Sequence, residues 1–414
     1  MPSTLIKNIK AVIGVQSKPS SFKKGTAMSV VETIENAYIL IEGDTISAFG
    51  SMENMPERAD VIIDAEAGLV MPCWCDSHTH IVLAEGREGE YVDRLKGVSY
   101  EEIAKKGGGI LNSANKLHLK SEDALYESAL NRLNEVIGMG TGAIEIKSGY
   151  GLSTESELKM LKVIRRLKEN SSATIKSTFL GAHAIPMQYK EDRQKYIDLV
   201  IHEMIPLVAG EGLADYCDVF CDKGFFTVSE TDQILKSAAK YGLKAKIHAN
   251  ELAISGGVQV GIANNAISVD HLEAIGQEEI DALKHADTIP TVLPSCSFFL
   301  HIHDAPARRM IDEGLGIAIA TDYNPGSSPS GNIPLLMALA CNNMRLIPSE
   351  AFNGVTINGA FAMELGESHG SISIGKKANL IITKPIPSLD YFVYAFGSNH
   401  IHKVLLNGKV VNNA

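Results

Sequence analysis

Two histidines one residue apart, His78 and His80, are the strongest chemical signal in the sequence. They follow the apolar run 68–72. On a β-strand, residues i and i+2 point to the same face, so both imidazoles can approach one point. Imidazole is the commonest metal ligand among side chains, and it suits zinc and iron. Two nitrogens do not complete a metal site, and such a pair can also consist of one packed and one solvated histidine. The prediction of a metal therefore depends on residues further along the chain.

The residues that best complete a metal site with this pair are His248 and Asp322. A catalytic metal with an open position needs about three or four protein ligands. The four residues would supply three neutral nitrogens and one carboxylate, a set that suits zinc or iron. Asp322 alone could equally cap a helix, because Asn-Pro-Gly follows at 324–326. The convergence of three histidines favours the metal, and we predict one divalent or trivalent ion, zinc or iron.

Three residues are candidates for moving a proton. Glu251 lies three residues after His248, where a carboxylate can reach water at the metal and act as a general acid or base. Taken alone, Glu251 could also be a solvated loop residue. His271 could hold the water or polarise a substrate carbonyl, and Asp322 is the third candidate. Metal coordination lowers the pKa of water to about 7, which gives hydroxide at neutral pH.

Arg87 and Tyr150 are candidates for binding a substrate. Arg87 follows the first predicted barrel strand, and Tyr150 follows the second. Both could recognise an anionic, polar small molecule, because a guanidinium group offers a carboxylate two parallel donors. The Gly-Gly-Gly stretch at 107–109 lacks the Gly-Lys-Ser/Thr ending of a phosphate-binding loop and is more typical of a flexible turn.

The elements that must position these residues are eight short apolar runs that alternate with amphipathic stretches. The runs are 69–83, 142–147, 175–183, 214–221, 243–248, 266–271, 288–293 and 316–322. This alternation predicts an α/β fold, a (β/α)8 TIM-type barrel, in which function resides at the carboxyl ends of the strands. The candidate residues fall at those ends. The other His-x-His pairs, 301/303 and 400/402, lie elsewhere and are expected to be structural or solvated.

The two ends of the chain have a different sequence pattern, in which short predicted strands are separated by turns. Residues 37–41 and 45–50 flank a short turn and predict a β-hairpin. Similar strand-turn-strand segments return at 371–375, 378–382 and 403–411. We therefore expect a small β-sandwich domain built from residues 1–67 and 366–414, and a barrel domain over residues 68–365.

Composition limits the possible functions. The chain has 414 residues, of which 45% are hydrophobic and 21% charged, as in soluble globular proteins. A net charge of -11 disfavours nucleic acid and anionic membranes as partners. The 6 cysteines show no disulfide framework, so a reducing compartment is expected. The N-terminus lacks a signal-peptide pattern and no apolar stretch is long enough to span a membrane, so we expect a cytoplasmic location.

The order of these motifs resembles the amidohydrolase superfamily in its one-metal form. Five stretches resemble the imidazolonepropionase family more narrowly: residues 85–88, 106–111, 145–152, 179–183 and 321–327. The resemblance covers nearly the whole chain, and Lys-Ser-Gly-Tyr-Gly at 147–151 is its most specific part. Enzymes of this family open the ring of 4-imidazolone-5-propanoate to give N-formimino-L-glutamate in histidine degradation.

The resemblance implies a role for each matching residue. It assigns the metal, zinc or iron, to His78, His80, His248 and Asp322. It places Arg87, Tyr100, Tyr150, His183 and Glu251 around the substrate, and Asn324, Gly326 and Ser327 near the product. It also implies a homodimer and a substrate with a carboxylate tail. Two-metal relatives carry a modified lysine at the end of the fourth strand, but Lys223 falls beyond that position, which favours one metal.

Two other functions remain possible from the sequence. Another one-metal amidohydrolase, such as a cytosine- or guanine-type deaminase, would share Glu251 and Asp322 but would not need Arg87 and Tyr150 arranged for a carboxylate. Release of ammonia would distinguish it. A non-catalytic scaffold on the same barrel would be expected to have lost metal ligands, and none of the four is missing.

Overall fold

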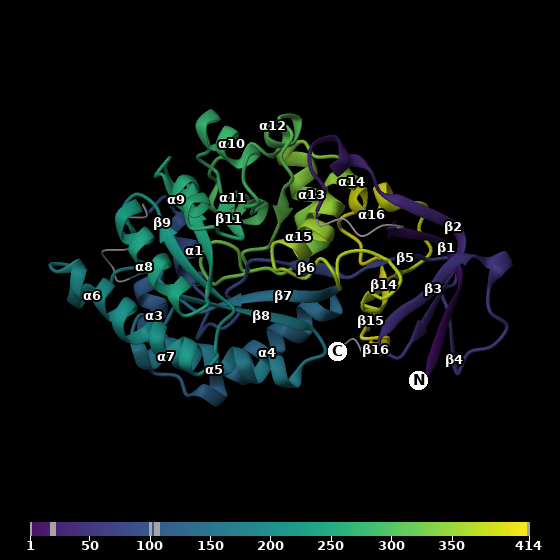
Figure 1. Ribbon diagram of the computed structural model, residues 1–414, viewed down its shortest axis with the longest axis horizontal. Helices are drawn as coiled ribbons and strands as arrows, with labels where there is room; N and C mark the ends of the chain where they lie inside the picture. The colour runs from purple at the N-terminus through teal and green to yellow at the C-terminus, as the bar shows by residue number, and fades with distance from the viewer. Residues whose placement is uncertain (1, 17–21, 99–101, 103–107, 412–414) are drawn as a thin grey trace.

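Eight parallel strands form the centre of the molecule (Figure 1). The computed structural model describes residues 2–16, 22–98, 102 and 108–411. The barrel strands are β6 (Trp74–Asp76), β7 (Thr141–Lys147), β8 (Thr174–Ala182), β9 (Tyr216–Cys221), β10 (Lys244–Ala249), β11 (Ser268–His271), β12 (Ile289–Val292) and β13 (Ala318–Ile319). Each pairs in parallel with the next along the chain. The predicted (β/α)8 barrel is confirmed.

The first and last strands meet just beyond their ends. Thr79 and Tyr323 form a parallel bridge. The backbone N–H of His80 donates to the carbonyl of Tyr323 at 2.9 Å, and that of Asp322 donates to the carbonyl of His78 at 3.0 Å. These bonds close the barrel at residues 78–80 and 322–323, so the seam of the barrel lies at the predicted metal site.

Helices lie outside the strands (Figure 1). They are α1 (Glu88–Leu95), α3 (Ile110–His118), α4 (Glu122–Gly138), α5 (Thr154–Asn170), α6 (Arg193–Leu199), α7 (Ile205–Gly210), α8 (Val228–Lys240), α9 (Gly257–Ala263), α10 (Gln277–Lys284), α11 (Pro294–Leu300), α12 (Ala307–Asp312), α13 (Ile333–Met344), α14 (Pro348–Val355), α15 (Ile357–Phe361) and α16 (Leu389–Tyr394). In α4, Leu125, Ala129, Leu133 and Val136 are buried, a spacing that places them on one helix face. Such faces pack on the strands and form the main core.

A second sheet joins the two chain ends. Its strands are β1 (Ser3–Val15), β2 (Glu32–Glu42), β3 (Thr45–Ser51), β4 (Val61–Asp64), β5 (Leu69–Pro72), β14 (Leu380–Thr383), β15 (Ile401–Leu406) and β16 (Lys409–Val411). β1 pairs with β2 along one edge and with β4 and then β5 along the other. β14 pairs with β5 and so connects the C-terminal strands to the N-terminal ones. The expected union of both chain ends is therefore confirmed.

Two expected strands differ from the structure. The run 69–83, expected as one barrel strand, is divided: β5 belongs to the terminal sheet and only β6 to the barrel. The chain changes partners at Cys73, whose N–H donates to Asn379, while that of Trp74 donates to Gly140. Both parts are fully buried, so the apolar pattern shows no break. Residues 371–375 form no strand, because only Ile372 bridges to Val15 before a turn. The domain boundaries at 67/68 and 365/366 stay predictions.

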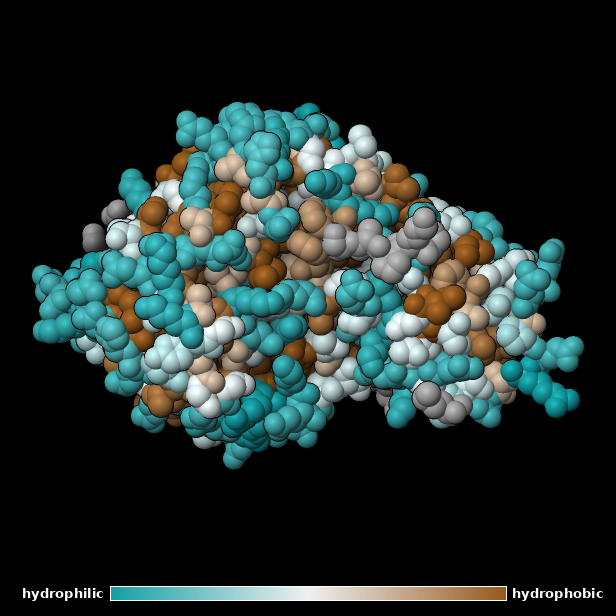
Figure 2. Space-filling model, in the orientation of Figure 1, coloured by the Kyte–Doolittle hydropathy of each residue, from teal (hydrophilic) through white to brown (hydrophobic). Residues whose placement is uncertain are grey.

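The surface is mixed in character. Figure 2 shows hydrophilic residues over much of one face, with hydrophobic residues between them. No helix among the described residues is both long and apolar enough to cross a membrane. All six cysteines are free thiols, and five of them are buried.

Candidate metal centre and active site

A cavity of about 660 Å³ opens at the carboxyl ends of the barrel strands. His80, Arg87, Tyr150, Glu251 and Asp322 all line it, although they are far apart in the sequence. His80 and Arg87 follow β6, and the other three follow β7, β10 and β13. The position agrees with the rule that such barrels bind ligands at this face.

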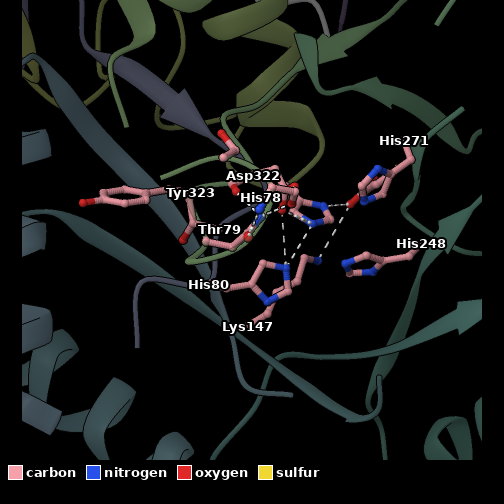
Figure 3. Close-up of polar contacts among 12 residues, drawn as sticks. His78, Thr79, His80, Lys147, His248, His271, Asp322 and Tyr323 are labelled. Atoms are coloured by element: carbon pink, nitrogen blue, oxygen red, sulfur yellow. Dashed lines mark hydrogen bonds and ion pairs between the residues drawn. The ribbon is translucent and has the colours of Figure 1, made fainter. Parts of the chain in front are cut away.

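Three of the predicted metal ligands, His78, His80 and Asp322, converge on one point, and His248 lies beside His78 (Figure 3). Asp322 Oδ1 lies 3.5 Å from His78 Nε2 and 3.6 Å from His80 Nε2, and the two Nε2 atoms are 3.3 Å apart. Ligands of one tetrahedral zinc ion, each at about 2.1 Å from the metal, are separated by about 3.4 Å. The His248 ring centroid lies 4.5 Å from that of His78, and its buried Nε2 has no hydrogen-bond partner among the described residues. The donor set therefore fits a zinc or iron ion.

Carboxylates beneath the histidines hold them in place. Asp270 Oδ2 lies 2.6 Å from His78 Nδ1, and Asp218 Oδ2 lies 2.9 Å from His248 Nδ1. The hydrogen bond between Asp270 and His78 keeps the proton of His78 on Nδ1 and leaves its Nε2 free to bind a metal, whereas Asp218 lies close to His248 Nδ1 without hydrogen-bond geometry. Burial, followed by the charge of Lys147, lowers the pKa of His78 well below its ordinary value, so its imidazole is neutral. Neutral imidazole is the form that binds metals.

Lys147 links these carboxylates inside the barrel. Its Nζ lies 2.8 Å from Asp218 Oδ2, 2.6 Å from Glu145 Oε1 and 3.7 Å from Asp270 Oδ2. Lys246 also pairs with Glu145, and it donates to the carbonyl of Ser77 at 3.0 Å. All these side chains are fully buried. Opposite charges and hydrogen bonds offset the cost of removing them from water.

The loop after β13 supports Asp322. Ser327 Oγ donates to Asp322 Oδ2 at 3.1 Å, which leaves Oδ1 facing the histidines. Asn324 Nδ2 donates to the carbonyl of Asp322 at 2.7 Å, and Asn324 Oδ1 accepts from the N–H groups of Gly326 and Ser327. Asn324, Gly326 and Ser327, predicted near the product, all line the cavity.

Glu251 and His271 line the cavity and form a second charged cluster with Glu273. His271 Nδ1 lies 3.7 Å from Glu251 Oε2 and 3.6 Å from Glu273 Oε2. Burial raises the pKa of Glu251 to about 7. Burial lowers the pKa of His271, but the charges of Glu251 and Glu273 outweigh it and raise that pKa well above the ordinary value. The cluster can therefore exchange protons near neutral pH.

The remaining predicted substrate residues that the structure describes, Arg87, Tyr150 and His183, line the same cavity. The Arg87 side chain is 13% exposed, and its guanidinium lies directly against Gly326, where an added Cβ would overlap Nη2. His183 Nδ1 donates to the carbonyl of Gly149 at 3.0 Å, which leaves Nε2 as an acceptor. Burial lowers the pKa of His183 to about 3, so it is neutral. Tyr150 is buried beside it.

The structure brings together every predicted site residue that it describes. Tyr100 and Gly107 lie outside the described residues. His78 and His80 lie just beyond β6 rather than on it, in an extended segment held by the barrel seam. His301, expected to be structural or solvated, lines the cavity. Lys223 is exposed after β9 and lies outside the cavity wall.

Sequence reasoning missed the support beneath the metal site. Asp218, Asp270 and Lys246 were not predicted to contribute. The signal that could have revealed them is a charged residue inside a strand that is otherwise apolar, as in β9, where every residue is buried. A charge at such a position needs a partner inside the barrel.

Comparison with known proteins identifies the family. The profile of the amidohydrolase family matches residues 69–411. A curated imidazolonepropionase from Flavobacterium johnsoniae is 55% identical over 409 residues, which cover 99% of this chain and 100% of that protein. The chain belongs to the imidazolonepropionase family of amidohydrolases. A second imidazolonepropionase, from Christiangramia forsetii, is 53% identical over 408 residues, covering 98% of this chain and 99% of that protein.

The fold is shared with more distant proteins of known structure. The crystal structure of 5-methylcytosine deaminase from Klebsiella pneumoniae, liganded with 5-fluorocytosine, superimposes with a TM-score of 0.74 at 16% identity. The alignment covers 98% of this chain and 97% of the deaminase. Because identity is this low, the likeness concerns the barrel and the terminal sheet, and the chemistry must be argued from the site.

Proposed function

We propose that the chain hydrolyses the ring amide of 4-imidazolone-5-propanoate to N-formimino-L-glutamate, a step of histidine degradation. The observation that carries the proposal is the near-full-length identity of 55% to an imidazolonepropionase. It is supported by a cavity that predicted metal ligands, Glu251, His271 and the partly buried Arg87 all line.

One metal ion, zinc or iron, would be held by the four residues His78, His80, His248 and Asp322. When bound, the metal would lower the pKa of a water molecule and polarise the ring carbonyl. Three nitrogens and one carboxylate suit both metals, so the choice between them is made by metal analysis of the purified protein.

Glu251 moves the proton. Its carboxylate accepts a proton from the water that attacks the carbonyl carbon of the ring. The bond between that carbon and the ring nitrogen then breaks, its electron pair stays on the nitrogen, and Glu251 returns the proton there. His271 donates a hydrogen bond to the carbonyl oxygen and stabilises the negative charge that develops on it.

Arg87 fixes the other end of the substrate. The propionate tail carries a carboxylate, and a guanidinium can hold it through two parallel hydrogen bonds. Tyr150 and His183 line the cavity between Arg87 and the metal ligands. Their place on that wall suits contacts with the ring and the tail.

A deaminase is the second candidate, because the same fold serves a 5-methylcytosine deaminase. Purified protein should consume the imidazolone, followed by its ultraviolet absorbance, without releasing ammonia. Arg87→Lys should lower kcat/KM for the acid. The expected loss of transition-state stabilisation is about 2 kcal/mol or more, because one contact with the substrate carboxylate is lost. The loss should be smaller for the amide analogue of the substrate. Ammonia release, or equal losses for both compounds, would favour the deaminase.

We further propose a cytoplasmic homodimer. The resemblance to imidazolonepropionases supports the dimer, and six free thiols suit a reducing compartment. Light scattering of the purified protein should give twice the chain mass of 44.6 kDa. A monomer mass over the working concentration range would contradict the dimer.

A further inference from the structure

We infer that a second divalent metal ion binds in the cavity, to Glu251, His271 and Cys296, and inhibits the enzyme. These residues follow or end three neighbouring strands, β10, β11 and β12. The inhibition, but not the binding, rests on the proposed function. The ions in question are zinc and its thiol-binding analogues, cobalt(II) and cadmium.

The ligand atoms of the proposed second site lie close together, and the distance between Glu251 and His271 resembles those in the first site. One ligand atom from each residue lies within 4.8 Å of the other two. The distance from His271 Nδ1 to Glu251 Oε2, 3.7 Å, is too long for a good hydrogen bond. It is close to the 3.5 and 3.6 Å between Asp322 and the histidines of the first site. Atoms held apart in this way leave room for an ion between them.

Unpartnered buried atoms are the second observation. His271 is 3% exposed, yet within the part of the chain that the structure describes its Nδ1 has no partner in hydrogen-bond geometry. The same holds for Oε2 of Glu273, which lies 3.6 Å from that nitrogen and can add a further oxygen ligand. The two atoms face each other as an ion pair without a hydrogen bond, and an ion between them would give each a direct ligand contact.

The chemistry of the cluster selects the ion. A thiolate, an imidazole and a carboxylate suit zinc, and the thiolate disfavours magnesium and calcium. Glu251 and His271 line the cavity, which gives the ion a path from solvent. The first site uses His78, His80, His248 and Asp322, so the two sites share no ligand and can be filled together. An ion bound to Glu251 and His271 would prevent both from exchanging protons.

Cobalt(II) tests the binding directly, because only the second site contains sulfur. Holoenzyme loaded with one zinc ion should bind one further cobalt ion and show a thiolate-to-cobalt charge-transfer band in the near ultraviolet. Cys296→Ser and Cys296→Ala should abolish the band and keep one metal ion per chain. Cys341→Ser, at the half-buried cysteine of α13, is the matched control and should keep the band. No band in the wild type, or an unchanged band in both Cys296 variants, would overturn the site.

Excess zinc tests the inhibition. It should suppress turnover of the imidazolone by the wild type and by Cys341→Ser. In Cys296→Ser the inhibitory zinc concentration should rise by about tenfold or more. Changing a residue that only hydrogen-bonds a metal ligand already lowers metal affinity by about that factor, so removing a ligand should lower it at least as much. Equal inhibition in all three proteins would overturn the inhibitory role. If the protein fails to hydrolyse the imidazolone at all, the cobalt spectrum still decides whether the site exists.

Discussion

Asp322 has a backbone φ of 52°, and His271 has one of 85°, both in the left-handed region that residues with a side chain rarely adopt. Each such conformation costs on the order of 1–3 kcal/mol. Hydrogen bonds from the loop after β13 and across the barrel seam hold Asp322 in it. The strained backbone aims Oδ1 at the two histidines, as metal binding requires.

His248 is the residue whose removal tests the metal centre. His248→Ala should lose most of the bound metal and nearly all turnover, because the site would keep only two nitrogens and one carboxylate. Metal content is measured on the purified variant. His285→Ala, an exposed histidine at the end of α10, is the control and should keep its metal. Normal metal content in the His248 variant would rule out the proposed ligand set.

Protonation of Glu251 should cause kcat/KM to fall on the acidic side of the pH profile. Because burial raises the pKa of Glu251 to about 7, the carboxylate is protonated below that pH and cannot accept a proton from water. We expect kcat/KM to fall about tenfold per unit below pH 7. Glu251→Gln should keep the metal and lower kcat by about 100-fold or more, and its kcat/KM should no longer fall below pH 7. If kcat/KM of the variant still fell below pH 7, a group other than Glu251 would cause that pH dependence.

Gly326 is expected to be required because Arg87 occupies the space of its missing side chain. Gly326→Ala should push the guanidinium away and raise KM for the imidazolone by about tenfold or more, the effect of losing about 1.4 kcal/mol of binding. Metal content should not change. The control is Gly89→Ala in α1, where an added Cβ has open space around it. An unchanged KM in the Gly326 variant would show that Arg87 does not bind the substrate.

At the scale of the elements, the order of strands and helices could be predicted because apolar runs and amphipathic stretches alternate strictly. The charged layer within the barrel could not, because a single charge in an apolar strand does not reveal its partner. A weak signal exists: Glu145 and Lys246 lie two residues before Lys147 and His248, on the same strand face, and Asp76 lies two residues before His78. A buried charge thus precedes two of the four predicted metal ligands.

Lys147 should matter to both stability and metal binding. Lys147→Met would leave Glu145, Asp218 and Asp270 without their shared cation in a buried layer. Breaking a buried ion pair in this way costs about 3–5 kcal/mol. Denaturant unfolding should show that loss, and a zinc titration should show weaker binding, because two ligand-orienting carboxylates would shift.

A matched variant separates this effect from loss of any lysine. Lys244 pairs with Glu364 on the surface, where its side chain is 56% exposed. Lys244→Met should change the free energy of unfolding by about 1 kcal/mol or less and leave zinc affinity as it was. Similar losses in both variants would mean that the buried layer does not support the metal site.

At the scale of the whole molecule, the division of 69–83 between two sheets couples the terminal domain to the barrel. β5 pairs with β1 and β14, and after Cys73 the chain enters β6, which leads to His78 and His80. The sequence could predict that the chain ends meet, because strand-turn-strand segments occur near both of them. It could not predict where the chain leaves one sheet for the other, because both sides are equally buried.

The metal should stabilise the fold as a whole, because its ligands join β6, β10 and the segment after β13 across the seam of the barrel. Binding to the native state alone adds about 4 kcal/mol of stability when the free metal is about 1,000 times its Kd. Removing the metal with a chelator should therefore lower the thermal midpoint, measured at one scan rate because a chain of this size can unfold irreversibly. Zinc should restore the midpoint of the wild type but not that of Asp322→Asn, in which a neutral amide replaces the carboxylate ligand. If chelation left the midpoint of the wild type unchanged, the four residues would not form a metal site that spans the seam.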